Sequence, residues 1–304
     1  MTRRFLAVIA ALLFFAAAVS AQRTVTTENE FSGFRNIDVS NRFDISVVRG
    51  DRHQVKLYAD ELISGYVSSY VKENTLYLDV DEKAFPSDLR KALRGKNAIV
   101  PVLKAEISVK HLDTLYLHDK VVVDNAAPLF SDDSVCIVMD GSSMISNLEF
   151  KGNCLNLDMK KSASANLRAE MKSFSANMAG GAALTMKHDA GKMRITSTGS
   201  SSVRTDGTSS GVSVFSESSA ELRLAGSSGS VNIVGSGKSV INADGLETGE
   251  ASVKLSGPAH CIVNATGNLK VDLSGGSHLI FNGTPAIEVV RISSSSMTRP
   301  GETK

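Results

Sequence analysis

The C-terminal half of the chain repeats one short pattern with a period near 19 residues. In each unit an apolar run ends at a corner of small or polar residues, such as Met139-Asp140-Gly141-Ser142 or Leu273-Ser274-Gly275-Gly276. A regular period kept over many units predicts a repeat architecture, in which each unit packs on its neighbours. Steps of 18 to 21 residues separate the third corner residues, which are Gly141, Lys161, Gly180, Gly199, Glu217, Ser236, Gly257 and Gly275.

Within a unit, apolar and polar residues alternate on both sides of the corner. Alternation of period two is typical of strands with one buried face. Further glycines, such as Gly207 and Gly226, are expected to end the second strand of a unit in a turn, because glycine tolerates positive φ. The pattern predicts an all-β fold, a single-chain parallel β-helix (β-solenoid) with rungs of about 19 residues, right-handed by the general preference of crossovers. The residues predicted to point inward include Leu157, Val240, Leu255 and Leu273.

The first 21 residues have the composition of a signal peptide. Arg3-Arg4 precedes the apolar run Phe5–Ala18, and Val19-Ser20-Ala21 resembles a cleavage site. No other segment approaches the length of apolar sequence that spans a bilayer, so we expect no transmembrane segment in the mature chain. The sequence therefore predicts an exported protein of the periplasm, the outer-membrane surface or the extracellular space.

The mature chain divides into four parts by composition. Strand-like segments before the ladder are longer, more aromatic and poorer in Ser than those within it. Ser87–Gly95 breaks their rhythm and predicts a short helix, and 60–71 fits either a loop or a short helix. The predicted parts are a flexible segment (22–30), β-rich first coils (31–133), the regular ladder (134–292) and a disordered tail (293–304).

Charge and aromatic content exclude some partners. The net charge is +1, charged residues make up 21% of the chain, Trp is absent and aromatic residues are only 6%. No basic field predicts binding to nucleic acid, and the usual aromatic platforms for stacking bases or sugars are scarce. The expected partner is a surface glycan or a protein ligand that the sequence does not identify.

The three cysteines are too few for a disulfide scaffold. Cys136 and Cys154 are separated by nearly one period and are expected to lie on neighbouring rungs. They form either a disulfide in an oxidising compartment or two half-buried free thiols.

Two histidines occupy the same place in consecutive units. His260 and His278 each follow a corner glycine by three residues. Since neighbouring parallel strands lie about 4.8 Å apart, the two rings are expected to form an exposed stacked pair. A weak metal site or a pH-sensitive patch is the alternative, but no Asp, Glu or Cys repeats in register as a third ligand. We therefore predict no metal site.

The acidic residues of the ladder do not form a recognisable catalytic set. Asp206 and Asp244 fall in predicted turns, and Asp140, Asp158 and Asp272 are expected to point outward as isolated charges. Hydrolysis of a polysaccharide needs two carboxylates that face each other, and none recur on adjacent rungs. Serines lack the strand–turn–helix context of a nucleophile elbow, and Gly-Ser runs lack the helix that follows a phosphate loop. No catalytic or cofactor-binding residue and no cofactor are predicted.

Several segments resemble a known family. Phe31-Ser32-Gly33-Phe34-Arg35-Asn36-Ile37-Asp38-Val39, the strand Phe43–Val47 and the corner Leu273-Ser274-Gly275-Gly276-Ser277 are similar to those of the auto-transporter adhesin head (GIN) domains. The resemblance covers most of 31–284 and implies a β-helical fold in exported proteins of Bacteroidetes. Lys161, Glu217 and Ser236 stand where the family's corners have glycine.

These observations lead to one leading function and two alternatives. The leading hypothesis is a non-enzymatic adhesin-like binding or structural module of the cell envelope or cell surface, because a long solenoid presents an extended face. The alternatives are a carbohydrate-active β-helix enzyme, either a polysaccharide lyase or a hydrolase, and a scaffold without a ligand. A groove with clustered carboxylates would favour the enzyme, and a face of Ser, Thr and Lys would favour binding.

Overall fold

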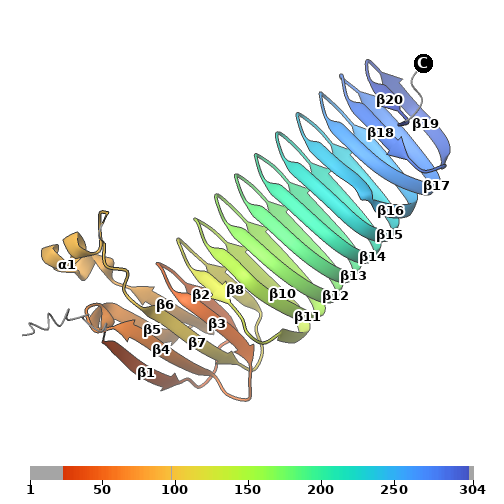
Figure 1. The fold of residues 1–304 in the computed structure, drawn as a ribbon. Helices are drawn as coiled ribbons and strands as arrows, with labels where there is room; N and C mark the ends of the chain where they lie inside the picture. Colours follow the sequence, from red (N-terminus) through yellow and green to blue (C-terminus); the bar gives the residue numbers. More distant parts are fainter. Residues whose placement is uncertain (1–22, 97, 301–304) are drawn as a thin grey trace, which may run out of the picture.

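The computed structural model describes residues 23–96 and 98–300, so the predicted signal peptide lies outside the described residues. Parallel strands stack into a solenoid of about 10 turns, which confirms the predicted fold class (Figure 1). The described residues contain no helix long and apolar enough to cross a membrane.

The first part of the chain contains short elements, and the ladder contains long strands. The short elements are β1 (Thr24–Glu30), β2 (Asn36–Val39), β3 (Asp44–Arg49), β4 (Gln54–Asp60), η1 (Ser64–Tyr66), β5 (Val67–Lys72), β6 (Thr75–Val80), η2 (Glu82–Ala84), α1 (Ser87–Ala92), β7 (Leu103–Val109), β8 (Thr114–Leu117) and β9 (Val122–Asp124). The ladder comprises β10 (Leu129–Met139), β11 (Met144–Met159), β12 (Ser164–Met178), β13 (Ala183–Ser197), β14 (Ser202–Ser216), β15 (Glu221–Gly235), β16 (Val240–Leu255), β17 (His260–Ser274), β18 (His278–Asn282), β19 (Ala286–Ser293) and β20 (Ser296–Thr298).

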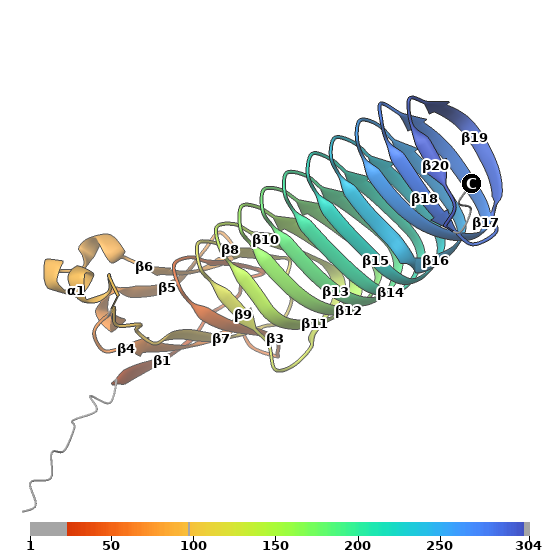
Figure 2. The same cartoon turned by 45° about the horizontal axis from the view of Figure 1, so that its top comes forward.

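Each long strand bends in its middle and contributes to two faces of a flattened coil (Figure 2). We call the half that follows a corner the first face and the half that precedes the next corner the second face. In β12 the two halves are Ser164–Met171 and Ser173–Met178. Every long strand pairs in parallel with the next, so the backbone groups of the inner rungs are hydrogen-bonded on both sides.

Side chains that point between the two faces form one continuous core. Leu157, Leu255 and Leu273 are buried there, as predicted. The prediction for Val240 is wrong, because its side chain is 47% exposed. Ser239 and Ile241, on either side of it, are the inward residues, and a period of two turns Val240 to the solvent.

The corners require one residue with positive φ in every rung. The third corner residue has this conformation in most units, including Lys161 with φ of 60°. In two units the prediction is wrong by one position, since Ser218 and Gly237 have positive φ in place of Glu217 and Ser236. The inward position just before each of those corners holds a small residue, Ser216 or Gly235. Alternation alone does not show that these residues, and not their apolar neighbours, point inward.

The prediction that additional glycines end strands is wrong for Gly207 and Gly226. Gly207 and Gly226 lie inside the continuous strands β14 and β15. A Cβ atom at Gly207 would lie 1.8 Å from the carbonyl oxygen of His188 on the preceding rung. Glycine is therefore needed there because two backbones approach closely, and the strand continues through it.

The N-terminal coils form a mixed end to the solenoid. β1 pairs antiparallel with β4, β4 with β7, and β5 with β6, whereas β2, β3, β8 and β9 continue the parallel ladders. The segment 22–30 was predicted to be flexible, but β1 occupies most of it and forms seven residue pairs with β4. The predicted short helix is present as α1. The 60–71 segment forms η1 and all of β5 except its last residue, so the expectation of a loop or short helix is wrong for 67–71.

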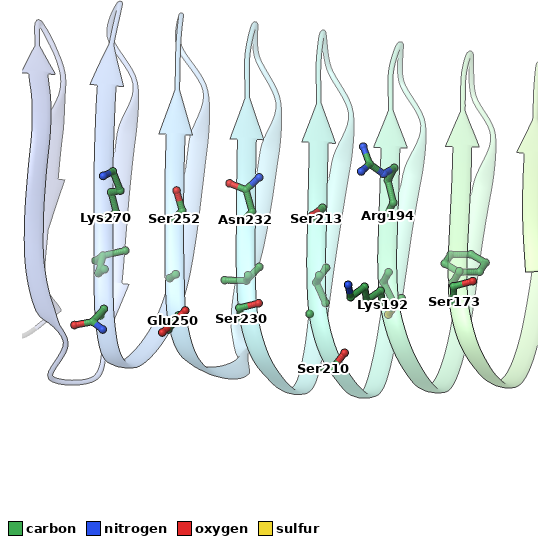
Figure 3. Close-up of a pocket in the computed structure, with 18 of the residues that line it drawn as sticks. Ser173, Lys192, Arg194, Ser210, Ser213, Ser230, Asn232, Glu250, Ser252 and Lys270 are labelled. Carbon is green, nitrogen blue, oxygen red and sulfur yellow. The ribbon is translucent and has the colours of Figure 1, made fainter. Parts of the chain in front are cut away.

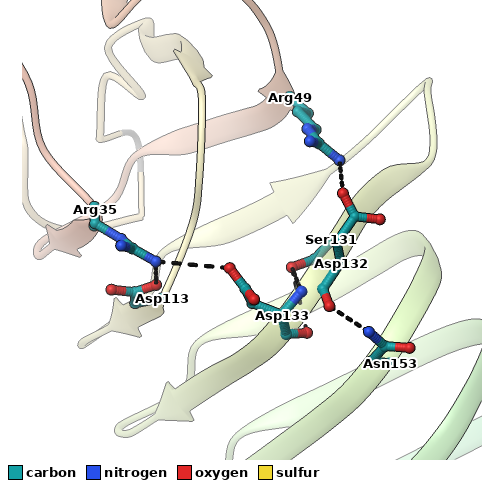
Figure 4. Close-up of polar contacts among 7 residues, drawn as sticks. All are labelled: Arg35, Arg49, Asp113, Ser131, Asp132, Asp133 and Asn153. Atoms are coloured by element: carbon teal, nitrogen blue, oxygen red, sulfur yellow. Dashed lines mark hydrogen bonds and ion pairs between the residues drawn. The ribbon is translucent and has the colours of Figure 1, made fainter.

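Polar contacts join the first coils to the ladder (Figure 4). Arg35 forms an ion pair of 2.7 Å with Asp113, and Arg49 forms one of 3.0 Å with Asp132. Such exposed pairs contribute little to stability; the first lies within the first coils, and the second joins the end of β3 to β10. Nearby, the buried side-chain amide of Asn125 accepts a hydrogen bond from the Val47 N–H and donates one to its carbonyl oxygen, so it completes the ladder.

The C-terminal end consists of ordered edge strands. β19 pairs with β17 on the second face, and β20 pairs with β18 on the first face. The predicted disordered tail is wrong for Ser296–Thr298, because these residues form β20, while residues 301–304 lie outside the described part. The last rung, 286–293, is a strand as predicted, but all of its side chains are exposed.

Candidate functional site

A shallow groove of about 1060 Å³ runs across the outer side of the second face. It extends from β11 to β19 and crosses the rungs nearly at right angles to the strands (Figure 3). Its walls come from outward positions on either side of buried residues such as Phe174, Met193 and Val212. Because the rungs are in register, each position repeats about every 4.8 Å along the groove.

Two rows of side chains line this polar groove. Strand register aligns them, and most of their members are Ser, Asn or Gly. Short polar side chains leave space above the sheet and present hydroxyl and amide groups that both donate and accept hydrogen bonds. The first row is Cys154, Ser173, Lys192, Gly211, Ser230, Glu250, Asn268 and Ala286, and the second row is Asn156, Ser175, Arg194, Ser213, Asn232, Ser252, Lys270 and Glu288.

Two cations stand together in the groove on β13. Lys192 and Arg194 are two residues apart, so they point to the same side of the sheet. Both are exposed, and neither has an acidic partner within ion-pair distance among residues 23–96 and 98–300. Their neighbours in the rows are serine and glycine, such as Ser175 and Ser213. The groove therefore carries a local positive charge that is not neutralised.

The other end of the groove contains charges of both signs. Lys270 lies about 19 Å from Arg194 along the second row, four rungs away, and forms an ion pair of 2.7 Å with Glu288. Glu250 lies in the first row, and its carboxylate has no hydrogen-bond or ion-pair partner in the described part of the chain. Its Cα is about 12 Å from that of Glu288 by strand geometry.

The acidic residues singled out from the sequence are not isolated charges. Asp140 accepts hydrogen bonds from the Lys161 ammonium and the Gly141 N–H, and these contacts lower the pKa of its carboxyl group. Asp158 contacts Lys160 at 3.3 Å. Asp272 contacts Arg291 at 2.8 Å and Lys254 at 4.0 Å. They point outward as predicted, but the prediction that they are isolated is wrong, because each has a cationic partner. The partners of Asp140 and Asp272 lie a rung away, where the alternating pattern does not reveal them.

His260 and His278 are register partners on β17 and β18, as predicted. Their ring centroids lie 4.9 Å apart, and the planes are tilted by 60°, so the rings are in contact without stacking in parallel. Nδ1 of His278 lies 2.6 Å from Ser296 Oγ on β20. No group of three metal-ligating side chains is found among the described residues, at this pair or elsewhere.

Cys136 and Cys154 lie on the neighbouring strands β10 and β11, but they are free thiols. The rung is 20 residues long at this point, so Cys136 pairs with Asn156 and Cys154 with Ser134. The two cysteines are therefore diagonal neighbours with Cα atoms about 8 Å apart by strand geometry. A disulfide needs less than about 7 Å, so of the two alternatives the free thiols hold.

One half-buried acid–base pair lies outside the groove, on β2 and the residue after β8. Asp38 Oδ1 is 3.5 Å from His118 Nε2. Burial raises the pKa of the Asp38 carboxyl group, although the nearby His118 opposes this. Neither residue lines the polar groove, and no group of three metal-ligating side chains in the described residues includes them.

Lys192 and Arg194 are not among the residues predicted from the sequence. The repeat could have identified them, because the equivalent positions one rung before and one rung after hold serine or glycine. Lys192 and Arg194 are therefore two cations between neutral residues in the rows. That signal can be used only when the register of the rungs is known.

Comparison with known proteins shows the family. A family model described as "Putative auto-transporter adhesin, head GIN domain" matches residues 33–210 and 183–285. No curated protein matches the chain.

Solved structures that are similar to this chain include proteins of Parabacteroides. A "putative lipid binding protein" and a "putative adhesin" of Parabacteroides distasonis are each 17% identical, with a TM-score of 0.48; the matches cover 92% of this chain and 97% and 98% of theirs. A "putative adhesin" of Parabacteroides merdae is 15% identical with a TM-score of 0.42, over 92% of this chain and 97% of that one. Since the family model matches residues 33–285, which make up most of the chain, the chain belongs to the auto-transporter adhesin head GIN domain family.

Proposed function

We propose that this protein is an exported, non-enzymatic adhesin-like module of the cell envelope or cell surface, and that the polar groove binds an extended glycan. The observation that carries the proposal is the cation pair Lys192 and Arg194, which has no acidic partner in the described residues and whose neighbours along the groove are serine and glycine. Membership of an adhesin family and the signal-like residues 1–21 support export.

The groove fits a polymer better than a small molecule. It is long and open, and the same polar positions recur on every rung, so a chain of sugar units would meet similar groups along its length. Hydroxyl-rich ligands suit Ser and Asn side chains, which donate and accept hydrogen bonds. Lys192 and Arg194 favour a polymer that carries carboxylate or sulfate groups.

The test is binding of the purified chain to an array of acidic and neutral polysaccharides. We expect retention on acidic polymers that weakens as salt is added, because screening reduces the attraction of exposed charges. The double variant Lys192→Ala/Arg194→Ala should lose most of this retention. The matched control is Arg204→Ala/Arg223→Ala, which removes two register-paired cations from the first face and should bind like the unchanged protein. Equal retention by both variants would refute the role of the groove.

A carbohydrate-active enzyme remains the second candidate because the Glu250 carboxylate lies in the groove without a partner in the described residues. Glu288, the other groove carboxylate, is held by Lys270. Hydrolysis by two carboxylates needs them about 5 to 10 Å apart, facing one bond. Release of reducing ends or unsaturated sugars that disappears in Glu250→Gln would establish the enzyme and contradict the binding module.

A further inference from the structure

The C-terminal end of the solenoid exposes the residues that continue its core. On β17 the inward positions Leu269, Val271 and Leu273 are 0% exposed. Their register partners on β19 are Ile287, Val289 and Ile292, which are 42%, 51% and 41% exposed. These side chains point in the same direction as the buried ones, but no strand of the described residues covers them. The outer backbone edge of β19 is likewise unpaired within 23–96 and 98–300.

The opposite end of the solenoid differs. There the edge strand β1 has the sequence Thr-Val-Thr-Thr-Glu-Asn-Glu and only one large apolar residue, Val25. Polar and charged residues on an edge strand oppose pairing with another chain. β19, with the sequence Ala-Ile-Glu-Val-Val-Arg-Ile-Ser, is more apolar, because four of its residues are Ile or Val. An apolar edge of this kind favours the addition of a further strand.

A bulge in β19 sets which of its side chains share a face. The register with β17 shifts at Val290, between the pairs Val271–Val289 and Asp272–Arg291. Glu288 and Arg291 are three residues apart and would point to opposite faces of a regular strand. Because of the bulge both point outward, where Glu288 contacts Lys270 and Arg291 contacts Asp272.

This arrangement is complementary to itself. If two β19 strands pair antiparallel about a two-fold axis between Val289 and Val290, Glu288 of each copy lies opposite Arg291 of the other. The same register places Ile287 opposite Ile292, and both are inward residues. Each outward line across the interface then alternates in charge: Lys270 and Glu288 of one copy, followed by Arg291, Asp272 and Lys254 of the other.

We propose that the occupant of this end is a second copy of the same chain, so that two solenoids join end to end through their β19 strands. A two-fold interface is satisfied by two chains and leaves no free apolar edge. The joined core would cover Ile287, Val289 and Ile292, and the polar grooves of the two copies would continue into each other on the same outer side.

The experiment is sedimentation of the purified chain over the micromolar concentration range. We expect the mass of two chains, falling to one chain on dilution. Glu288→Arg and Arg291→Glu should each raise the dissociation constant at least about 100-fold, because each reversal places two like-charged pairs in the interface. The matched controls Glu217→Arg and Arg223→Glu, on exposed residues far from β19 along the ladder, should sediment like the unchanged protein.

Mixing the two β19 variants is the decisive step. In a mixed pair, one copy carries cations at both positions 288 and 291, and the other copy carries carboxylates at both. Each cation again faces a carboxylate, so the two-chain mass should return. Local damage to the last rung would not be repaired by mixing.

Circular dichroism and thermal melting check that each variant is folded. A protein that sediments as one chain throughout, an open-ended series of masses, or folded variants that fail to combine would overturn the proposal.

Discussion

Replacing Ser239 by Ala is expected to stabilise the protein. The residue between each corner and the first face that follows it is inward and at most 1% exposed in all eight repeated units. Four rungs have alanine at this position and four have serine, so the backbone accommodates either residue. The alanines are Ala163, Ala182, Ala220 and Ala259, and the serines are Ser143, Ser201, Ser239 and Ser277.

The serines differ in whether the hydroxyl group is satisfied. Ser239 Oγ is buried and has no hydrogen-bond partner among the described residues. Ser201 Oγ lies 2.7 Å from Ser197 Oγ and donates to the Thr198 carbonyl oxygen at 2.8 Å. Burying a hydroxyl without a partner costs about 1–3 kcal/mol, and removing its one oxygen leaves little empty volume. We therefore expect Ser239→Ala to raise the free energy of unfolding by about 1 kcal/mol.

Ser201→Ala is the matched comparison. It removes two hydrogen bonds and leaves Ser197 without its partner, so the free energy of unfolding should fall by about 1–2 kcal/mol. Urea unfolding followed by circular dichroism measures the free energy of unfolding of the two variants. Their midpoints are compared only where the m-values agree, because long repeat arrays can depart from two-state behaviour. A loss in Ser239→Ala as large as that in Ser201→Ala would refute the reasoning, because it would show that the Ser239 hydroxyl is already satisfied.

Three further predictions concern the core and its titratable groups. Leu255→Ala should lower the free energy of unfolding by about 2–5 kcal/mol in the same urea assay, because the side chain is 1% exposed; a loss well under about 1 kcal/mol would contradict its place in the core. A thiol reagent at pH 8 should label Cys136 and Cys154 in the folded protein but not Cys261, whose pKa burial raises to about 12; labelling of all three before unfolding would count against this. Burial lowers the pKa of His188 below 6.5, so between that lowered pKa and 6.5 the unfolded chain binds a proton that the folded chain does not. Its contribution to stability is therefore present above pH 6.5 and declines as the pH falls, and His188→Gln should flatten this dependence in melting curves; an NMR titration midpoint of His188 above 6.5 would contradict it.

Much of the ladder could be predicted from the sequence because its interactions are periodic. One residue per corner needs positive φ, and alternate residues must be buried, so the same requirements return with every rung. The period places Gly141 and Gly180 at corners and Leu157, Leu255 and Leu273 in the core, and it pairs His260 with His278. The motifs around Phe31–Val39 and Leu273–Ser277 led to the family that the family model confirms.

The features that the sequence did not reveal depend on contacts between distant residues. The step from Gly141 to Lys161 gives a rung of 20 residues, but only the pairing of β10 with β11 shows that this register also holds at Cys136 and Cys154 and sets the two cysteines diagonally. The pairing of β1 with β4 joins segments that are separated in the sequence by β2 and β3, and polar residues in β1 carry no alternating signal.

The candidate site is one of the features that the sequence did not reveal. Short side chains at Ser175, Ser213 and Ser252 become a groove only when parallel pairing aligns them on one face. The partners of Asp140 and Asp272 are also a rung away. The sequence by itself determined the rung, its corners and its inward residues, since these depend on local conformation and burial. Only the tertiary structure decided which outward side chains became neighbours, because that depends on the length of every rung between them.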